Sequence, residues 1–229
     1  MTLKEIVLGI TALAVLAALP GRASAGWFLD VYAGYAVFES QAITFGSDRL
    51  KNVEYESSPV FGGRAGYFFD ELGFFGIALD ASYFRQDVDT QVVTSTARGR
   101  LSLANTDLSL TAIGLDVIVR VPLYRSPERP LGLLQPYVTV GPTLFFVNAD
   151  DTGNFGPPNN QSPHRTSGGF KVGTGLAWQF HRALAVFAEY RFLYTTTELQ
   201  FRSSTPGVNT PVNVDTYTNQ VVGGISVRF

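Results

Sequence analysis

The sequence has no cysteine and only two histidines among its 229 residues. A chain without cysteine has no disulfide to stabilise it, and two histidines are too few for a transition-metal cluster. The stretch 148–154 could offer Asp150, Asp151 and Asn154 to calcium, but it lacks the ligand spacing of a dedicated calcium loop. We therefore expect neither a metal nor a cofactor.

An excess of basic residues is also absent. The chain has 17 Lys and Arg against 19 Asp and Glu, which gives a formal net charge of −2. Proteins that bind nucleic acid carry basic patches that neutralise phosphates. The composition therefore indicates no nucleic-acid partner.

Long apolar runs are missing beyond residue 25, whereas residues 1–25 contain one. Lys4 precedes an apolar run over 6–19, and Ala23-Ser24-Ala25 follows a Pro-Gly break. This order predicts a secretory signal peptide cleaved after Ala25, with an uncleaved anchor as the alternative. The run is too short for a comfortable transmembrane helix, and the rest of the chain has no apolar stretch near the required length of about 20 residues. We take 1–25 as the signal peptide and 26–229 as one folded domain.

What the remainder does contain is apolar residues alternating with small or polar ones. This period of two is typical of strands with two different faces. It recurs over eight ranges, which are 27–39, 61–69, 74–87, 107–121, 134–147, 169–180, 184–195 and 217–229. Two ranges are irregular. Leu108 and Leu110 fall in the opposite phase, which predicts a bulge near Thr111, and Pro136 and Pro142 predict interrupted pairing in the fifth strand.

The connections between these ranges alternate in length around the chain. Links after the second, fourth and sixth ranges are short or medium, and those after the first, third, fifth and seventh are long. Short turns at one end and larger loops at the other are typical of transmembrane barrels. The sequence thus predicts an all-β fold, an eight-stranded antiparallel up-and-down transmembrane β-barrel.

The charged residues share one face with the glycines and serines. They are Asp30, Arg64, Asp80, Asp116, Arg120, Lys171, Glu189, Arg191 and Arg228. A soluble lipocalin-like barrel, the alternative fold, would turn its apolar face inward and its charges to water. The other face here is almost purely apolar and aromatic, so we expect it to meet lipid and the charges to lie in the lumen. Pairing of these charges would plug the lumen; the alternative is a narrow pore lined by Arg64, Asp80, Glu189 and Arg191.

Aromatic residues gather near the ends of the ranges, where the headgroups of a bilayer would lie. The predicted membrane girdles include Trp27, Tyr35, Phe69, Phe74, Tyr83, Trp178, Phe180 and Tyr194.

The closing run NQVVGGISVRF, the run QPYVTVGPTLF and the repeated strand pattern carry a resemblance. The chain resembles the small outer-membrane β-barrel family, which includes the OmpA transmembrane domain, the Ail/Lom proteins and the opacity-type surface antigens. The resemblance implies an outer-membrane location, contact with outer-membrane lipid and lipopolysaccharide, and an assembly signal read by the barrel-assembly machinery. That signal would be carried by Val221, Ile225, Val227 and Phe229.

Recognition would fall to the four long connections, about 40–58, 86–106, 148–168 and 196–216, since exposed loops on a rigid scaffold commonly carry binding sites. Arg49 with Lys51, and Arg98 with Arg100, could meet lipopolysaccharide phosphates or acidic host polymers. The expected role is structural or adhesin-like, in a monomer. A narrow porin-like channel is the first alternative. A lipid A-modifying enzyme is the second, but neither His164 nor His181 stands in a catalytic arrangement, so we expect no enzyme.

Overall fold

The computed structural model of the protein describes most of the chain beyond residue 25. The described residues are 26–38, 41–45, 48–53, 57–69, 72–88, 91–95, 99–103, 106–126, 131–151, 164–202 and 209–229. The predicted signal peptide lies outside them, so its cleavage after Ala25 stays a prediction. No helix among the described residues has the length and apolarity needed to cross a membrane.

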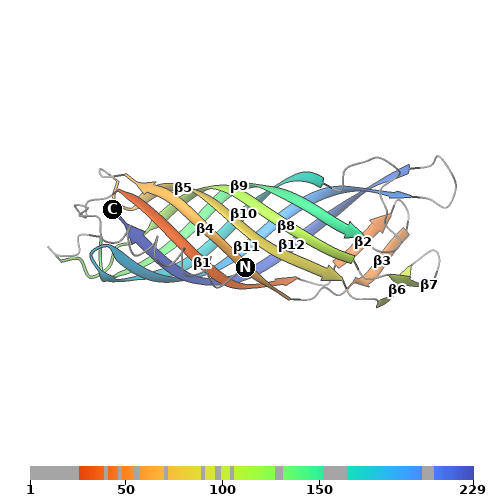
Figure 1. Ribbon diagram of the computed structural model, residues 1–229, viewed down its shortest axis with the longest axis horizontal. Coiled ribbons are helices and arrows are strands. Elements are labelled where there is room, and N and C mark those ends of the chain that lie inside the picture. The colour runs from red at the N-terminus through yellow and green to blue at the C-terminus, as the bar shows by residue number, and fades with distance from the viewer. Residues whose placement is uncertain are drawn as a thin grey trace, which may run out of the picture.

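Eight long strands close into one antiparallel barrel (Figure 1). Going round the barrel, the order is β1-β12-β11-β10-β9-β8-β5-β4, and the pairing of β1 with β4 closes it. The strands are β1 (Trp27–Phe38), β4 (Ser58–Phe68), β5 (Phe75–Val88), β8 (Thr106–Arg120), β9 (Leu134–Asp151), β10 (His164–His181), β11 (Leu184–Arg202) and β12 (Asn209–Arg228). The predicted fold is confirmed, with strands from β9 onward reaching further into the long connections than their alternation indicated.

Four short strands form a separate sheet at the end of the barrel opposite the C-terminus (Figure 1). Its order is β2-β3-β6-β7, built from β2 (Gln41–Phe45), β3 (Asp48–Val53), β6 (Gln91–Ser95) and β7 (Gly99–Leu103). These strands lie in two connections that the sequence analysis treated as loops. Each has only five or six residues, too few for a period of two to stand out from a polar background.

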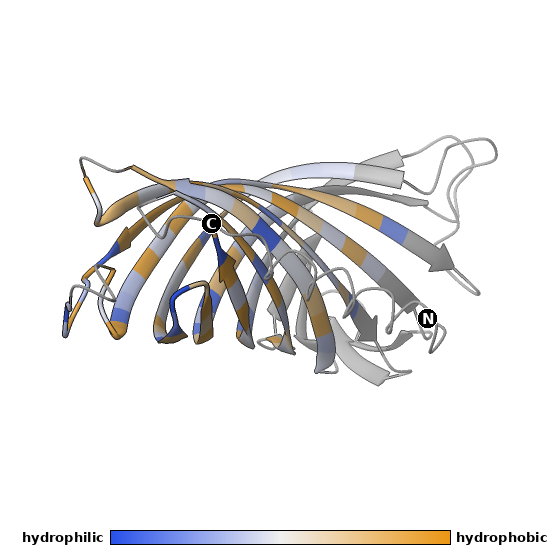
Figure 2. Cartoon of the chain, turned by 60° about the vertical axis from the view of Figure 1, so that its left-hand side comes forward, coloured by the Kyte–Doolittle hydropathy of each residue, from blue (hydrophilic) through white to orange (hydrophobic). Residues whose placement is uncertain are grey.

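The apolar phase of the strands faces outward, as predicted. Figure 2 shows apolar and polar bands alternating along the described strands. Trp27, Leu79 and Val221 are 65%, 58% and 60% exposed, although all three are large and apolar. A belt of this kind around a closed barrel is the surface that lipid covers.

The predicted bulge near Thr111 is wrong. β8 pairs with β5 in one continuous register from Val119 opposite Phe75 to Thr106 opposite Val88. Leu110 is buried inside the barrel, so it differs in phase from the outward residues because it faces the lumen. An apolar side chain is as acceptable there as a polar one, because the interior of a narrow barrel is filled by side chains.

The prolines of β9 affect its pairing only in part. The register of β9 with β10 runs unbroken past Pro136 and Pro142. On the other side, the β8 ladder keeps its register but lacks the two pairs at Leu115 and Asp116, opposite Pro142 and Gly141. Proline has no N–H to donate, which accounts for a gap at this position.

Large inward aromatic rings alternate with glycines on adjacent strands. Tyr32 lies opposite Gly62, and a Cβ added to Gly62 would collide with the Tyr32 hydroxyl. Tyr137 stands in the same relation to Gly175, where an added Cβ would lie 2.6 Å from the ring. Three more register pairs repeat the arrangement: Phe28 with Gly66, Phe68 with Gly76 and Phe187 with Gly224. Glycine is used here because each ring lies over the neighbouring backbone.

Candidate functional site in the barrel lumen

The nine charged residues predicted to lie in the lumen all occupy it. Eight are at most 6% exposed, and Arg228, near the end of β12, is partly buried. They come from seven of the eight barrel strands, because each strand brings its polar phase inward.

Arg64 on β4 is the hub of a central cluster. Its Nη2 lies 2.6 Å from Oε2 of Glu189 on β11, and its Nε lies 3.2 Å from Oδ2 of Asp80 on β5. A third carboxylate, Asp30 on β1, lies 3.9 Å from the same Nε. Glu189 also accepts a hydrogen bond of 2.7 Å from the Tyr137 hydroxyl. The Arg64 guanidinium thus links β4 to three other strands of the barrel, β1, β5 and β11.

Two further cations complete this cluster. Lys171 Nζ lies 2.9 Å from Asp80 and 2.8 Å from Asp116. Arg191 contacts Glu189 at 2.8 Å and lies with its guanidinium carbon 4.0 Å from the centre of the Tyr32 ring. Tyr32 in turn donates a 3.0 Å hydrogen bond to Asp80. The central cluster therefore joins three cations to four carboxylates, with two tyrosines as additional partners.

Several of these contacts cross the lumen. Arg191 on β11 lies 3.5 Å from Asp80 on β5, and these strands are four positions apart around the eight-stranded barrel. Lys171 also contacts Asp80, and its strand β10 is three positions from β5. Side chains from opposite walls thus meet at the axis. The charged groups of the central cluster fill the cross-section of the lumen at this level.

A second group of polar side chains, the lower group, lies nearer the end with the short turns. It consists of Arg120, Gln135, Gln179 and Arg228. Arg120 donates from Nε to the Gly73 carbonyl at 3.0 Å and from Nη1 to Gln135 Oε1 at 3.3 Å. Arg228 donates from Nη1 to the same oxygen at 2.8 Å and to Gln179 Oε1 at 3.1 Å. The Gln135 amide is fixed by the carbonyl of Gly132, whose φ of 83° favours glycine. Among the described residues, neither arginine of this lower group has a carboxylate within ion-pair distance.

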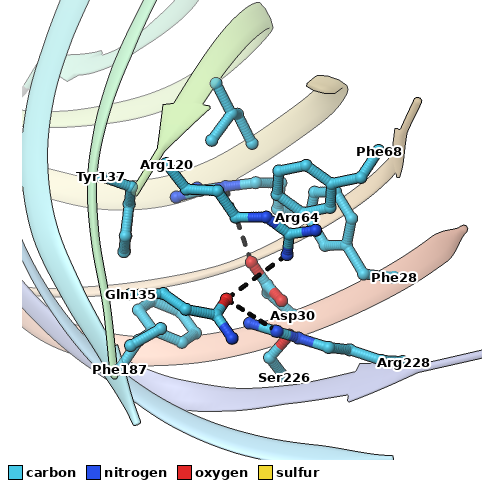
Figure 3. A pocket seen from close by; sticks show the side chains of 12 residues that line it. Phe28, Asp30, Arg64, Phe68, Arg120, Gln135, Tyr137, Phe187, Ser226 and Arg228 are labelled. Carbon is cyan, nitrogen blue, oxygen red and sulfur yellow. Dashed lines mark hydrogen bonds and ion pairs between the residues drawn. The ribbon is translucent and has the colours of Figure 1, made fainter. Parts of the chain in front are cut away.

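The lower group borders a small cavity, shown in Figure 3. Its volume is about 30 Å³, and Asp30, Arg64, Arg120, Gln135, Tyr137 and Arg228 line it together with apolar side chains. Arg120 lies over the Phe68 ring at 3.5 Å from its centre and closes one side of the cavity.

Four further residues belong to this site and were not predicted from the sequence: Tyr32, Tyr137, Gln135 and Gln179. Tyr32 and Gln179 share the phase of Asp30 and Lys171 on their own strands, and that phase was the available signal. Gln135 and Tyr137 share only the phase of the threonines of β9. Alternation tells which face a side chain occupies, but partners across the lumen depend on the strand stagger, which a single strand does not reveal.

The predicted girdle residues all lie on the outer surface of the barrel. Trp27, Tyr35, Phe74, Tyr83, Trp178 and Phe180 are exposed, and Phe69 and Tyr194 are partly exposed. Neighbouring rings contact one another, such as Trp178 with Phe180 at a centroid distance of 6.1 Å. Of the proposed assembly signal, Val221 and Ile225 are exposed, and the Phe229 amide donates to the Trp27 carbonyl at 2.9 Å. Val227 is buried instead, with Leu29 and Leu184 as its register partners on either side.

The two histidines lie at the two ends of β10. His181 is exposed at the end of β10, where its Nδ1 accepts a 3.3 Å hydrogen bond from the Ala183 amide. His164 begins the same strand at its other end, 17 positions away in the chain. Within the segments that the structure describes, no three acidic or histidine side chains are grouped so as to hold a metal ion. The stretch 152–154, part of the weighed calcium site, lies outside the described residues.

Residues 11–229 match the family model of the outer membrane protein beta-barrel domain, so the chain belongs to this family of outer-membrane barrels. The earlier resemblance is thereby confirmed, and the outer membrane is the location of the protein. No curated protein matches the chain.

Two solved structures share the fold at low identity. The chain is similar to OprG from Pseudomonas aeruginosa at 17% identity, with 90% of this chain and 97% of that one covered and a TM-score of 0.59. It is also similar to neisserial surface protein A at 15% identity, with 89% and 97% covered and a TM-score of 0.51.

Proposed function

We propose that the protein is a non-enzymatic surface-interaction barrel, closed in its lumen by charge pairing and active through its extracellular segments. The observation that carries the first half is the central cluster, in which Arg191 and Lys171 reach Asp80 from other walls of the barrel. An eight-stranded barrel has an interior just wide enough for side chains to fill. A continuous water path past these contacts would require the ion pairs to part.

Planar-bilayer recording of the refolded protein tests the closed lumen. We expect no steady conductance from the protein in salt solution. Heat-dependent mobility in SDS gels shows in parallel that the barrel is folded, since a closed barrel resists SDS until it is heated. Reproducible single-channel currents from folded protein would refute the closed lumen and favour the narrow-channel alternative.

Lipid analysis tests the non-enzymatic half of the proposal. Lipid A from cells that express the protein is expected to have the same mass as lipid A from cells that lack it. A mass shift that depends on the protein would instead support the lipid-modifying alternative. An Arg125→Gln variant serves as a folded-barrel comparison, because Arg125 is exposed beside the short turns and lies outside the central cluster.

The second half of the proposal concerns the separate four-stranded sheet. Transmembrane barrels of this kind place long connections outside the cell and short turns in the periplasm, which puts the sheet on the extracellular side. Lys51 on β3 is in register with Thr94 on β6, and Thr94 with Arg100 on β7. Arg49 lies two residues before Lys51 on the same strand. The basic residues of two distant connections thus come together in one sheet, and Arg98, the fourth, lies outside the described residues.

Basic residues that share one sheet fit a saccharide that carries phosphate or sulfate groups, as lipopolysaccharide and acidic host polymers do. The test measures binding of lipopolysaccharide and of a sulfated polysaccharide to the refolded protein at rising salt. We expect salt-sensitive binding that weakens several-fold in Lys51→Gln with Arg100→Gln. Arg125→Gln, which removes an exposed arginine beside the short turns, should bind like the wild type. Equal binding by all three proteins would refute the role of the sheet, and the ligand that binds identifies the source.

A further inference from the structure

Two arginines that line the cavity of the lower group carry buried hydrogen-bond donors without partners. Arg120 is 2% exposed, and its Nη2 has no hydrogen-bond partner. The Nε of Arg228 is also buried without a partner. Both arginines line the cavity, and Figure 3 shows their guanidinium groups on either side of Gln135. Buried donors without partners are rare, since each loses its water without regaining a hydrogen bond.

The charges of the described lumen do not balance either. Five cations (Arg64, Arg120, Lys171, Arg191 and Arg228) face four carboxylates (Asp30, Asp80, Asp116 and Glu189), which leaves one positive charge in excess. The ion pairs of the central cluster use Arg64, Lys171 and Arg191, so the excess falls on the lower group. Its two guanidiniums are held by glutamine carbonyls, which accept hydrogen bonds but supply no negative charge.

The geometry points to a binding site for one small inorganic anion of halide size, between Arg120 and Arg228 in the periplasmic half of the lumen. One monovalent anion would supply the missing negative charge and accept from the two free donors. The cavity volume of about 30 Å³ exceeds the roughly 10–15 Å³ that a single water needs, so a halide fits there and a large organic anion does not.

One acceptor on the cavity wall would repel an anion. Oδ1 of Asp30 is buried without a hydrogen-bond partner, while its other oxygen lies toward Arg64. The anion therefore lies away from Asp30, where it accepts from Arg120 and Arg228, and a water molecule donates to Asp30 across the remaining space. This arrangement gives a partner to each of the three unsatisfied atoms.

Unfolding in two salts tests the site, and the test does not depend on the proposed surface function. The refolded protein is unfolded with urea in sodium chloride or in sodium gluconate at equal ionic strength, so that general screening is the same. An anion that binds only the folded state raises the ratio of folded to unfolded protein, about 100-fold at 100 times its dissociation constant. We expect the urea midpoint of the wild type to be higher in chloride.

Two variants locate the effect. In Arg120→Met the difference between chloride and gluconate should vanish, while in Arg125→Gln, which removes an exposed arginine of the neighbouring turn, it should persist. If Arg120→Met does not fold, as judged by its gel mobility, Arg228→Gln replaces it. Equal wild-type midpoints in the two salts would overturn the proposal and leave the cavity to water alone. Loss of the chloride effect in Arg125→Gln as well would place the anion on the surface and overturn it too.

Discussion

Replacing Glu189 by glutamine is the sharpest test of the central cluster. Glu189 is 2% exposed, and its two oxygens accept from Arg64, Arg191 and Tyr137 at 2.6, 2.8 and 2.7 Å. Glutamine is nearly the same size, so the change removes charge and one acceptor without opening a cavity. Its amide N–H groups would also point at a guanidinium, which has only donors to offer.

The cost follows from what remains after the substitution. Of its carboxylate partners, Arg191 keeps only Asp80 at 3.5 Å, and Arg64 keeps Asp80 at 3.2 Å and Asp30 at 3.9 Å. Removing one partner of a buried ion pair typically costs about 3–5 kcal/mol, because the other charge stays buried and uncompensated. We expect a loss of this size in the free energy of unfolding of Glu189→Gln.

Urea unfolding of the refolded barrel in lipid vesicles measures this loss. Thr139→Val is the matched control in the same lumen, since the Thr139 hydroxyl is buried without a partner and its removal should cost under about 1 kcal/mol. A double-mutant cycle with Arg64→Met should give a coupling of about 0.5–3 kcal/mol between the two residues. A loss below about 1 kcal/mol in Glu189→Gln would mean that water replaces the carboxylate, and the closed lumen would then be refuted.

Two further substitutions test the outer and inner faces of the wall. Leu115→Arg, midway along the lipid face of β8, should cost about 2–4 kcal/mol in vesicle unfolding, whereas Val121→Arg, at the end of the same face, should cost at most about 1 kcal/mol; equal costs would contradict the lipid-facing assignment. Gly175→Ala would place a Cβ 2.6 Å from the Tyr137 ring, so overpacking should cost about 1–3 kcal/mol in the same assay. Gly168→Ala, where an added Cβ meets nothing within 4 Å, should be nearly neutral, and a larger cost there than at Gly175 would contradict the ring-over-glycine packing.

The barrel itself follows from the sequence because its two causes are local. Alternation decides which face each residue takes, and the lengths of the connections decide which strands are neighbours. Asp80, for example, shares a phase with Ser82 and Ala78, and the structure buries all three. The small outer sheet was not predictable in this way, because strands of five or six residues carry little periodicity and pair across distant connections.

The partners within the lumen were out of reach for a different reason. Arg64 and Glu189 are 125 residues apart, and their meeting depends on the tilt and stagger of strands around the whole barrel. The unbalanced lower group was missed as well, since a count of five bases and four acids on one face looks like near-complete pairing. The position of the charges along the barrel axis decides their partners. Because Arg120 and Arg228 both lie near the short turns, their guanidinium groups face glutamines.

The charged phase of the strands also bears on how such a chain reaches its membrane. With 45% hydrophobic residues, the sequence would form long apolar runs if those residues were clustered. Instead, residues such as Asp116 and Arg120 interrupt the outward sequence Ile113, Leu115, Val117 and Val119 at short intervals. A stretch of about 20 apolar residues is what defines a helical membrane span, and β8 never approaches it. The charged residues that are buried inside the folded barrel are therefore the same ones that keep the unfolded chain free of a long apolar stretch, the feature of a membrane helix, during export.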